Sequence, residues 1–229
     1  TEVPVVERHR IRAVAADNGI GISAVHWVLI KTEGMYMTHT DPEIRRKTAE
    51  YFCELVNFCA DLGGEAIVVG SPKQRNLLPG VSFEQARELA KETFAPSIKL
   101  AEDKGVTICF EPLAPSETDF VNTAAKGIEF IRQFDSDAFK IILDVKAMCS
   151  DPKPIPDIIR DSHPNFAYFH ANDANLKGPG FGDVDFKPIF GALKEVGYDG
   201  FVSVEVFDFE EGPETIARES LRYMREASG

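Results

Sequence analysis

The feature that most constrains this chain is a regular alternation of short apolar runs with longer amphipathic segments. The apolar runs are rich in Val, Ile and Phe, as buried strands are, and the segments between them show helical periodicity. In one such segment Asp41 can cap a helix, Pro42 stands in its first turn and Gly63 closes its end. Apolar strands that alternate with helices predict an α/β fold with a parallel sheet covered on its faces.

Six runs along the chain read as strands. They are residues 21–29 (GISAVHWVL), 65–70 (EAIVVG), 106–111 (VTICFE), 139–144 (FKIILD), 166–170 (FAYFH) and 201–207 (FVSVEVF). A closed TIM-type (β/α)8 barrel needs two more strands, and residues 5–19 have the pattern of a helix that follows a strand. We therefore expect a TIM (β/α)8-type barrel in one domain over residues 1–229. Its first one or two β/α units would precede Thr1, or a neighbouring chain would fill the gap.

Composition narrows the classes of partner. The formal net charge is -12 and no long basic run occurs, so neither nucleic acid nor an anionic membrane is expected as a partner. No apolar run approaches the roughly 18 residues of a membrane-spanning helix, and no signal segment opens the chain, which predicts a cytoplasmic protein. The cysteines form no CxxC pair and lie in apolar contexts, which predicts buried reduced thiols at Cys53, Cys59, Cys109 and Cys149.

Four consecutive predicted strands end, or nearly end, in a side chain that can bind a metal. These residues are Glu111, Asp144, His170 and Glu205, and successive members lie 33, 26 and 35 residues apart. Each spacing is about one β/α unit, so the four side chains should lie side by side at the carboxyl edge of the sheet, where α/β folds place their ligands. Taken singly, such an acid often caps a helix and such a histidine is usually structural. Together they suit Mn²⁺, Mg²⁺ or Co²⁺.

Longer motifs carry a resemblance to a known family. They are FEPLAPSETDFVNT (110–123), LDVKAM (143–148), FHANDANLKGPGFGDVDF (169–186) and VSVEVFD (202–208). These segments resemble the sugar phosphate isomerase/epimerase family, the xylose isomerase-like TIM barrels that include ketose 3-epimerases, hydroxypyruvate isomerases and inosose dehydratases. Two earlier segments, VHWVLIKTEG and VVGSPKQRN, agree with the same family.

The resemblance implies a metal centre and a reaction. In that family the residues that match Glu111, Asp144, His170 and Glu205 bind one divalent metal ion. The family chemistry is proton transfer beside a carbonyl group through an enediolate, and the role of base maps to Glu111 and Glu205. The ion polarises the carbonyl, and no redox cofactor is needed.

One position departs from the family pattern. Many members have a histidine three residues after the aspartate of the LD motif, where it contacts the substrate, but this chain has Ala147. Lys146 lies two residues after Asp144 and would share its face if the strand continued. Lys146 is then either the missing substrate contact or a solvated loop lysine, and the substitution leaves the substrate and the reaction type open.

Other polar or aromatic residues are candidates for substrate binding. Lys177 lies in the glycine-rich loop after His170, which would wall the pocket or serve as a plain connection to the next helix. Trp27 reads as either core or a wall for a sugar, and the segment SPKQRN as either a binding loop or a solvated turn. The candidates in this group are His26, Trp27, Lys73, Arg75, Glu117 and Lys177.

We therefore predict a divalent-metal-dependent isomerase or epimerase of a small sugar, sugar phosphate or related polyhydroxy ketone. The alternatives are an inosose-dehydratase-like lyase, an abasic-site endonuclease of the same barrel class and a non-catalytic barrel protein. The expected partner is a small carbohydrate, and a homodimer or a homotetramer is the assembly to test.

Overall fold

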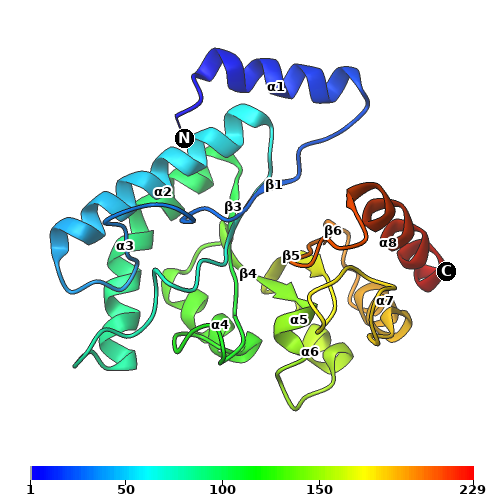
Figure 1. Ribbon diagram of the computed structural model, residues 1–229. Coiled ribbons are helices and arrows are strands. Elements are labelled where there is room, and N and C mark those ends of the chain that lie inside the picture. The colour runs from blue at the N-terminus through cyan, green and yellow to red at the C-terminus, as the bar shows by residue number, and fades with distance from the viewer. Residues whose placement is uncertain (1) are drawn as a thin grey trace.

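The computed structural model describes residues 2–229 and has six parallel strands in one open sheet, ordered β1 to β6 as in the sequence (Figure 1). The strands are β1 (Ala24–Val25), β2 (Ala66–Val69), β3 (Thr107–Phe110), β4 (Phe139–Asp144), β5 (Phe166–Ala171) and β6 (Val202–Val204). The predicted α/β TIM-barrel-like class and the six strands are confirmed. Within residues 2–229 the sheet does not close, and the expected β/α units before Thr1 stay a prediction.

Helices alternate with the strands and most of them cover one face of the sheet, whereas α1 packs against α2. They are α1 (Val5–Asp17), α2 (Pro42–Leu62), α3 (Phe83–Lys104), α4 (Ala124–Ile131), the 3₁₀ helix η1 (Arg132–Phe134), α5 (Val145–Met148), α6 (Ile155–Ser162), α7 (Phe186–Glu195) and α8 (Pro213–Ser228). The predicted boundaries of α2 are observed: the Asp41 side chain accepts a hydrogen bond from the backbone N–H of Glu43, and Gly63 ends the helix at φ 79°. Helix α2 packs beside α3, and α7 packs between α6 and α8 (Figure 1).

The two faces of the sheet have different cores. Alternate strand residues such as Ile67 and Ile108 join the large core beneath the helices, whose centre is a cluster of stacked and edge-on phenylalanine rings. The intervening residues form a second, smaller cluster on the opposite face: Ala66, Val68, Cys109, Ile142 and Tyr168. Because side chains alternate along a strand, residues two positions further on also face this inner side.

The edge strands are shorter than predicted. Residues 21–29 form a strand only at Ala24–Val25, and residues 201–207 only at Val202–Val204. Each edge strand has one hydrogen-bonded neighbour in the described sheet instead of two, so fewer backbone bonds hold it extended. In addition, Trp27 adopts a left-handed backbone conformation with φ 55°, which cannot continue a strand.

The structure also bears on the predictions about membrane-spanning helices and cysteines. None of the helices described between residues 2 and 229 is long and apolar enough to cross a lipid bilayer. The four cysteines are free thiols, and Cys59 and Cys109 are buried as predicted, whereas Cys53 is half-buried. The prediction is wrong for Cys149, which is exposed because it lies in the turn after the short helix α5 and not within an apolar element.

Candidate metal centre and adjoining cavity

Four buried side chains converge at the carboxyl edge of the sheet. Glu111 follows β3, Asp144 ends β4, His170 lies in β5 and Glu205 follows β6. The first three each come two residues after a member of the inner cluster, and Glu205 comes two residues after Ser203, which contacts Tyr168 of that cluster; this spacing aims all four at the inner side. One ligand atom from each lies within 4.8 Å of those of the others. The structure thus brings together the residues that their strand-end positions singled out, and their role as ligands stays a prediction.

The sheet register aligns these residues. Asp144 stands beside His170 in the β4–β5 pair, and His170 stands beside Ser203 in the β5–β6 pair. Glu205 is two residues beyond Ser203, so its carboxylate returns to the inner side next to the imidazole. The Nδ1 atom of His170 lies 3.1 Å from Oε2 of Glu205 and 3.8 Å from Oδ2 of Asp144.

Burial and charge set the ionisation of the three acids. Burial, together with the charges of Asp144 and Glu205, raises the pKa of Glu111 well above its ordinary value. Burial and the Glu205 charge raise the pKa of Asp144 to about 6. Burial also opposes ionisation of Glu205, but the neighbouring imidazoles of His170 and His26 hold its pKa below the ordinary range. Without a nearby cation, ionising all three buried carboxylates of this cluster at once is energetically unfavourable.

The donor set fits a divalent cation. Three carboxylates and an imidazole offer oxygen and nitrogen ligands that suit hard or borderline ions. The buried Nδ1 atom of His170 lies 3.1 Å from Oε2 of Glu205 without forming a well-aligned hydrogen bond, which leaves this nitrogen available to bind an ion. A bound cation would also relieve the repulsion that raises the pKa values of Glu111 and Asp144. These residues therefore fit one ion at this position.

Two residues that sequence reasoning missed shape the cluster. The fully buried Asn172 side chain donates to Oδ2 of Asp144 over 2.6 Å and accepts from the backbone N–H of Lys146 over 2.7 Å. Gly70 follows β2, and a Cβ atom there would lie 1.8 Å from Oε2 of Glu111. The signals were present: Asn172 comes two residues after His170, and Gly70 ends an apolar strand.

A polar bridge joins the two edges of the sheet below the cluster. The hydroxyl of Tyr168 lies 2.8 Å from Oγ of Ser23 and 2.6 Å from Oγ of Ser203. Ser23 immediately precedes β1 and Ser203 lies in β6, so side chains connect strands whose backbones do not pair in the described sheet. Above the bridge, Nδ1 of His26 lies 3.6 Å from Oε1 of Glu205. The β1 segment thus contributes to the environment of Glu205.

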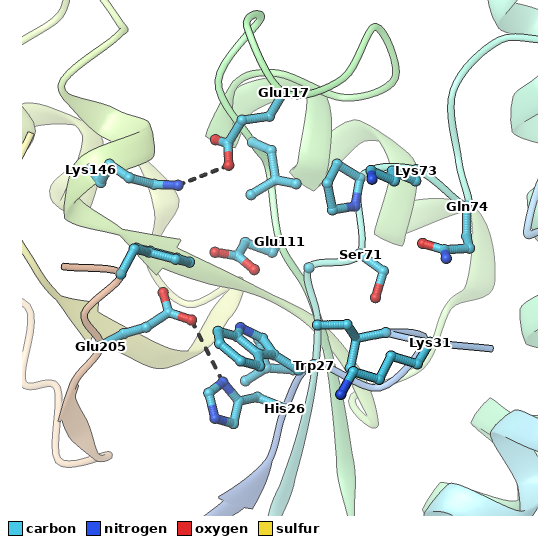
Figure 2. A pocket seen from close by; sticks show the side chains of 16 residues that line it. His26, Trp27, Lys31, Ser71, Lys73, Gln74, Glu111, Glu117, Lys146 and Glu205 are labelled. Carbon is cyan, nitrogen blue, oxygen red and sulfur yellow. Dashed lines mark hydrogen bonds and ion pairs between the residues drawn. The ribbon is translucent and has the colours of Figure 1, made fainter. Parts of the chain in front are cut away.

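A cavity of about 520 Å³ opens beside the cluster (Figure 2). Glu111 and Glu205 line it, whereas Asp144 and His170 are not among the described residues of its wall. Trp27 and Phe207 stack over each other with ring centroids 6.4 Å apart and form an apolar part of the wall. The predicted substrate-binding residues that line the cavity are His26, Trp27, Lys73, Glu117 and Lys146.

Lys146 is held firmly in the cavity wall. Its ammonium group donates to Oε1 of Glu117 over 2.8 Å and lies 4.5 Å from the centre of the Phe207 ring. Burial opposes the charge of Lys146, but the hydrogen bond and charge of Glu117 raise its pKa above the ordinary value. The structure therefore places Lys146 at the cavity as a paired cation, and not as a solvated loop lysine.

Two other predicted contacts lie away from the cavity wall. Arg75 is fully buried, donates to the backbone carbonyl of Glu111 over 2.8 Å and stacks 4.7 Å from the centre of the Phe110 ring. Its Nε and Nη2 atoms have no hydrogen-bond partner within the described residues. Lys177 donates to Oε1 of Glu211 over 2.6 Å, in an ion-pair group at the loop surface.

Comparison with known proteins adds family evidence. A family described as "Xylose isomerase-like TIM barrel" matches residues 4–227 of this chain. The chain is 26% identical over 204 residues to a D-psicose 3-epimerase of Ruminiclostridium cellulolyticum, a match that covers 88% of this chain and 69% of that protein. It is 27% identical over 186 residues to an L-ribulose 3-epimerase of Mesorhizobium japonicum, covering 80% of this chain and 62% of that protein.

One match has a higher identity over a shorter stretch. The chain is 33% identical over 107 residues to a D-psicose 3-epimerase of Agrobacterium fabrum, which covers 47% of this chain and 37% of that protein. Among solved structures, a D-psicose 3-epimerase crystallised in the presence of D-fructose superposes with a TM-score of 0.88 and 24% identity. That superposition covers 100% of this chain and 86% of the other, and it establishes a shared fold.

Proposed function

The chain belongs to the xylose isomerase-like TIM barrel family, and on that premise we propose that it is a divalent-metal-dependent epimerase of a small ketose or ketose derivative. The observation that carries this proposal is the placement of Glu111 and Glu205. Both belong to the buried four-residue cluster and both also line the cavity. Two carboxylates that would help to hold the ion and can also reach the substrate are suited to proton transfer beside a carbonyl.

The four side chains would hold the ion between them. When bound, a Mn²⁺, Mg²⁺ or Co²⁺ ion would polarise the substrate carbonyl and stabilise negative charge on oxygen. Asp144 and His170 are off the cavity wall, and we assign them to binding the ion. Asn172 fixes the Asp144 carboxylate, and Asp144 also accepts from the backbone N–H of Ala147 over 2.7 Å.

Glu111 and Glu205 would move the proton. One carboxylate removes the proton from the carbon beside the carbonyl, and the other returns a proton to the opposite face, which inverts that carbon. Figure 2 shows the two carboxylates reaching the cavity from different segments, Glu111 after β3 and Glu205 after β6.

The rest of the wall would orient the sugar. The stacked faces of Trp27 and Phe207 suit the C–H face of a carbohydrate. The Lys146–Glu117 pair offers a donor and an acceptor to hydroxyl groups at the same wall. We place Lys146 in the role that a histidine fills in many relatives, where this chain has Ala147.

Deuterium exchange tests the proposal. Metal-free protein is reloaded with Mn²⁺ and incubated with a panel of ketopentoses, ketohexoses, their phosphates and inososes in deuterated water. We expect NMR to show deuterium at the carbon beside the carbonyl together with the epimeric ketose. Loss of water from an inosose would instead indicate a lyase. Absence of exchange into every ketose, neutral or charged, by Mn²⁺-loaded protein would overturn the proposal.

A further inference from the structure

We infer that the substrate carries an anionic group, a phosphate or a carboxylate, which Lys31 and Lys73 bind at the end of the cavity away from the metal centre. This inference rests on the proposed function, because the same cavity would hold the substrate. The anionic group would be a substituent of the ketose, separate from its reacting carbons.

The cavity is polarised along its length. Figure 2 shows Lys31, Lys73, Gln74 and Ser71 on the side opposite Glu205, and all four line the cavity. Lys31 comes from the loop after β1, and the other three come from the loop after β2. A ligand that extends across the cavity therefore has the carboxylates of Glu111 and Glu205 on one side and the two ammonium groups on the other.

The two lysines are the uncompensated charges of this wall. Lys146 is paired with Glu117, and the ion would lie against Glu111 and Glu205. Within the described residues 2–229, neither Lys31 nor Lys73 has an ion-pair partner. In a protein with a formal net charge of -12, they leave a charge of about +2 facing the cavity, which matches the -1.5 to -2 of a phosphate monoester.

The loops that carry the lysines are fixed to each other. The backbone N–H of Leu29 donates to Oγ of Ser71, and the Gln74 side chain donates to the backbone carbonyl of Leu29, both over 3.2 Å. Trp27 and Lys31 have left-handed backbones at φ 55° and φ 60°. Such conformations are unfavourable in residues other than glycine and persist where the surroundings impose them, often at binding sites.

The cavity has room for a substituent. Its volume of about 520 Å³ lies within the roughly 300–1,000 Å³ that encloses drug-sized ligands. A bare ketose has few heavy atoms, so a group beyond the sugar carbons fits between the acids and the lysines. Lysine is a common phosphate ligand because its ammonium group acts as a compact point charge.

Binding of unreactive polyols tests the inference. Isothermal calorimetry on Mn²⁺-loaded protein compares glucitol, glucitol 6-phosphate and gluconate, which lack a carbonyl and are not turned over. We expect at least one of the two anions to bind 10-fold or more tighter than glucitol, with a preference that weakens as salt is raised. Which anion binds tighter identifies phosphate or carboxylate as the source of the charge.

Substitution of the two lysines tests whether they cause the preference for the anion. The double substitution Lys31→Met with Lys73→Met should abolish the preference for the anion while leaving glucitol affinity within about twofold. The matched control is Lys99→Met with Lys187→Met, which removes the same charge from exposed positions on α3 and α7 and should keep the preference. Circular dichroism checks that the variants fold. The salt dependence of binding by the wild type tests the inference without any variant.

Two outcomes overturn the inference and leave the proposed function intact. One is equal binding of glucitol and both anions by the wild type. The other is an anion preference that survives in the Lys31 and Lys73 variant. Deuterium exchange into neutral ketoses would still support epimerisation in either case, so the two proposals fail separately.

Discussion

The two ends of the cavity are built in different ways. At the acid end Glu111 and Glu205 line the cavity, and Asp144 and His170 adjoin them off the wall. All four are at most 8% exposed and are placed by strands with a fixed register. The opposite end is carried by loops, and there Lys31 and Lys73 are exposed. Strand ends fix atoms rigidly for chemistry, whereas loops can change without disturbing the sheet. The difference suggests that the acid end sets the reaction and the loop end sets the substrate.

The largest effect should come from the acid end. Glu205→Gln keeps an oxygen donor but removes the basic carboxylate, so turnover should fall by roughly two orders of magnitude or more. Glu111→Gln should do the same. Steady-state rates with metal content measured on the same samples check this. A Glu205→Gln enzyme that keeps its metal and turns over near the wild-type rate would contradict the claim that the acid end sets the reaction.

A smaller but still large effect is expected when the room for Glu111 is removed. Gly70→Ala puts a Cβ atom where Oε2 of Glu111 now lies, so the carboxylate must move and turnover should fall by about 10- to 100-fold. Gly191→Ala is the matched control, because a Cβ atom there meets nothing within 4 Å and alanine favours the helix. Equal rates in the two variants would show that the position of Glu111 is not critical.

Asn172 offers a graded test of the metal centre. Asn172→Ala removes the donor to Oδ2 of Asp144, and loss of such an outer contact lowers metal affinity by about 10- to 100-fold. Competition with a fluorescent chelator measures the dissociation constant of Mn²⁺. An unchanged constant in a folded variant would mean that the Asp144 carboxylate needs no such support.

The smallest effect concerns the pH dependence of stability without metal. The pKa of Asp144 is raised to about 6 in the folded chain, so the folded state binds the extra proton and stability falls as pH rises from about 4 to 7. The raised pKa of Glu111 acts in the same direction. We expect the unfolding midpoint of metal-free protein to drop by a few degrees more than that of Asp144→Asn between pH 5 and pH 8. Parallel curves for the two proteins would contradict the electrostatic account.

The sequence predicted the acid end well because strand and helix periodicity specify it. A strand with side-chain period two that ends in an acid places that acid at a known edge and face, so Glu111, Asp144, His170 and Glu205 could be grouped before any geometry was known. The central strands also matched closely, since β4 was predicted at its observed bounds, Phe139–Asp144.

The loop end was predicted less well for a physical reason. Lys73 and Arg75 lie two residues apart in one loop, yet Lys73 faces the cavity and Arg75 is buried against Phe110. Loops have no fixed side-chain period, so sequence spacing does not tell which residue points inward. The same holds for Lys177, whose ion pair with Glu211 depends on how two distant loops meet. Asn172 and Gly70 matter through single contacts that no periodic pattern encodes.

Anomalous scattering from crystals of Mn²⁺-loaded protein tests the central claim most directly. We predict one manganese peak per chain, within coordination distance of Glu111, Asp144, His170 and Glu205, and no peak at this position in His170→Ala crystals soaked in the same way. A full-occupancy peak that survives the His170 substitution, or a wild-type peak located elsewhere, would contradict the assignment of these four residues as the metal centre.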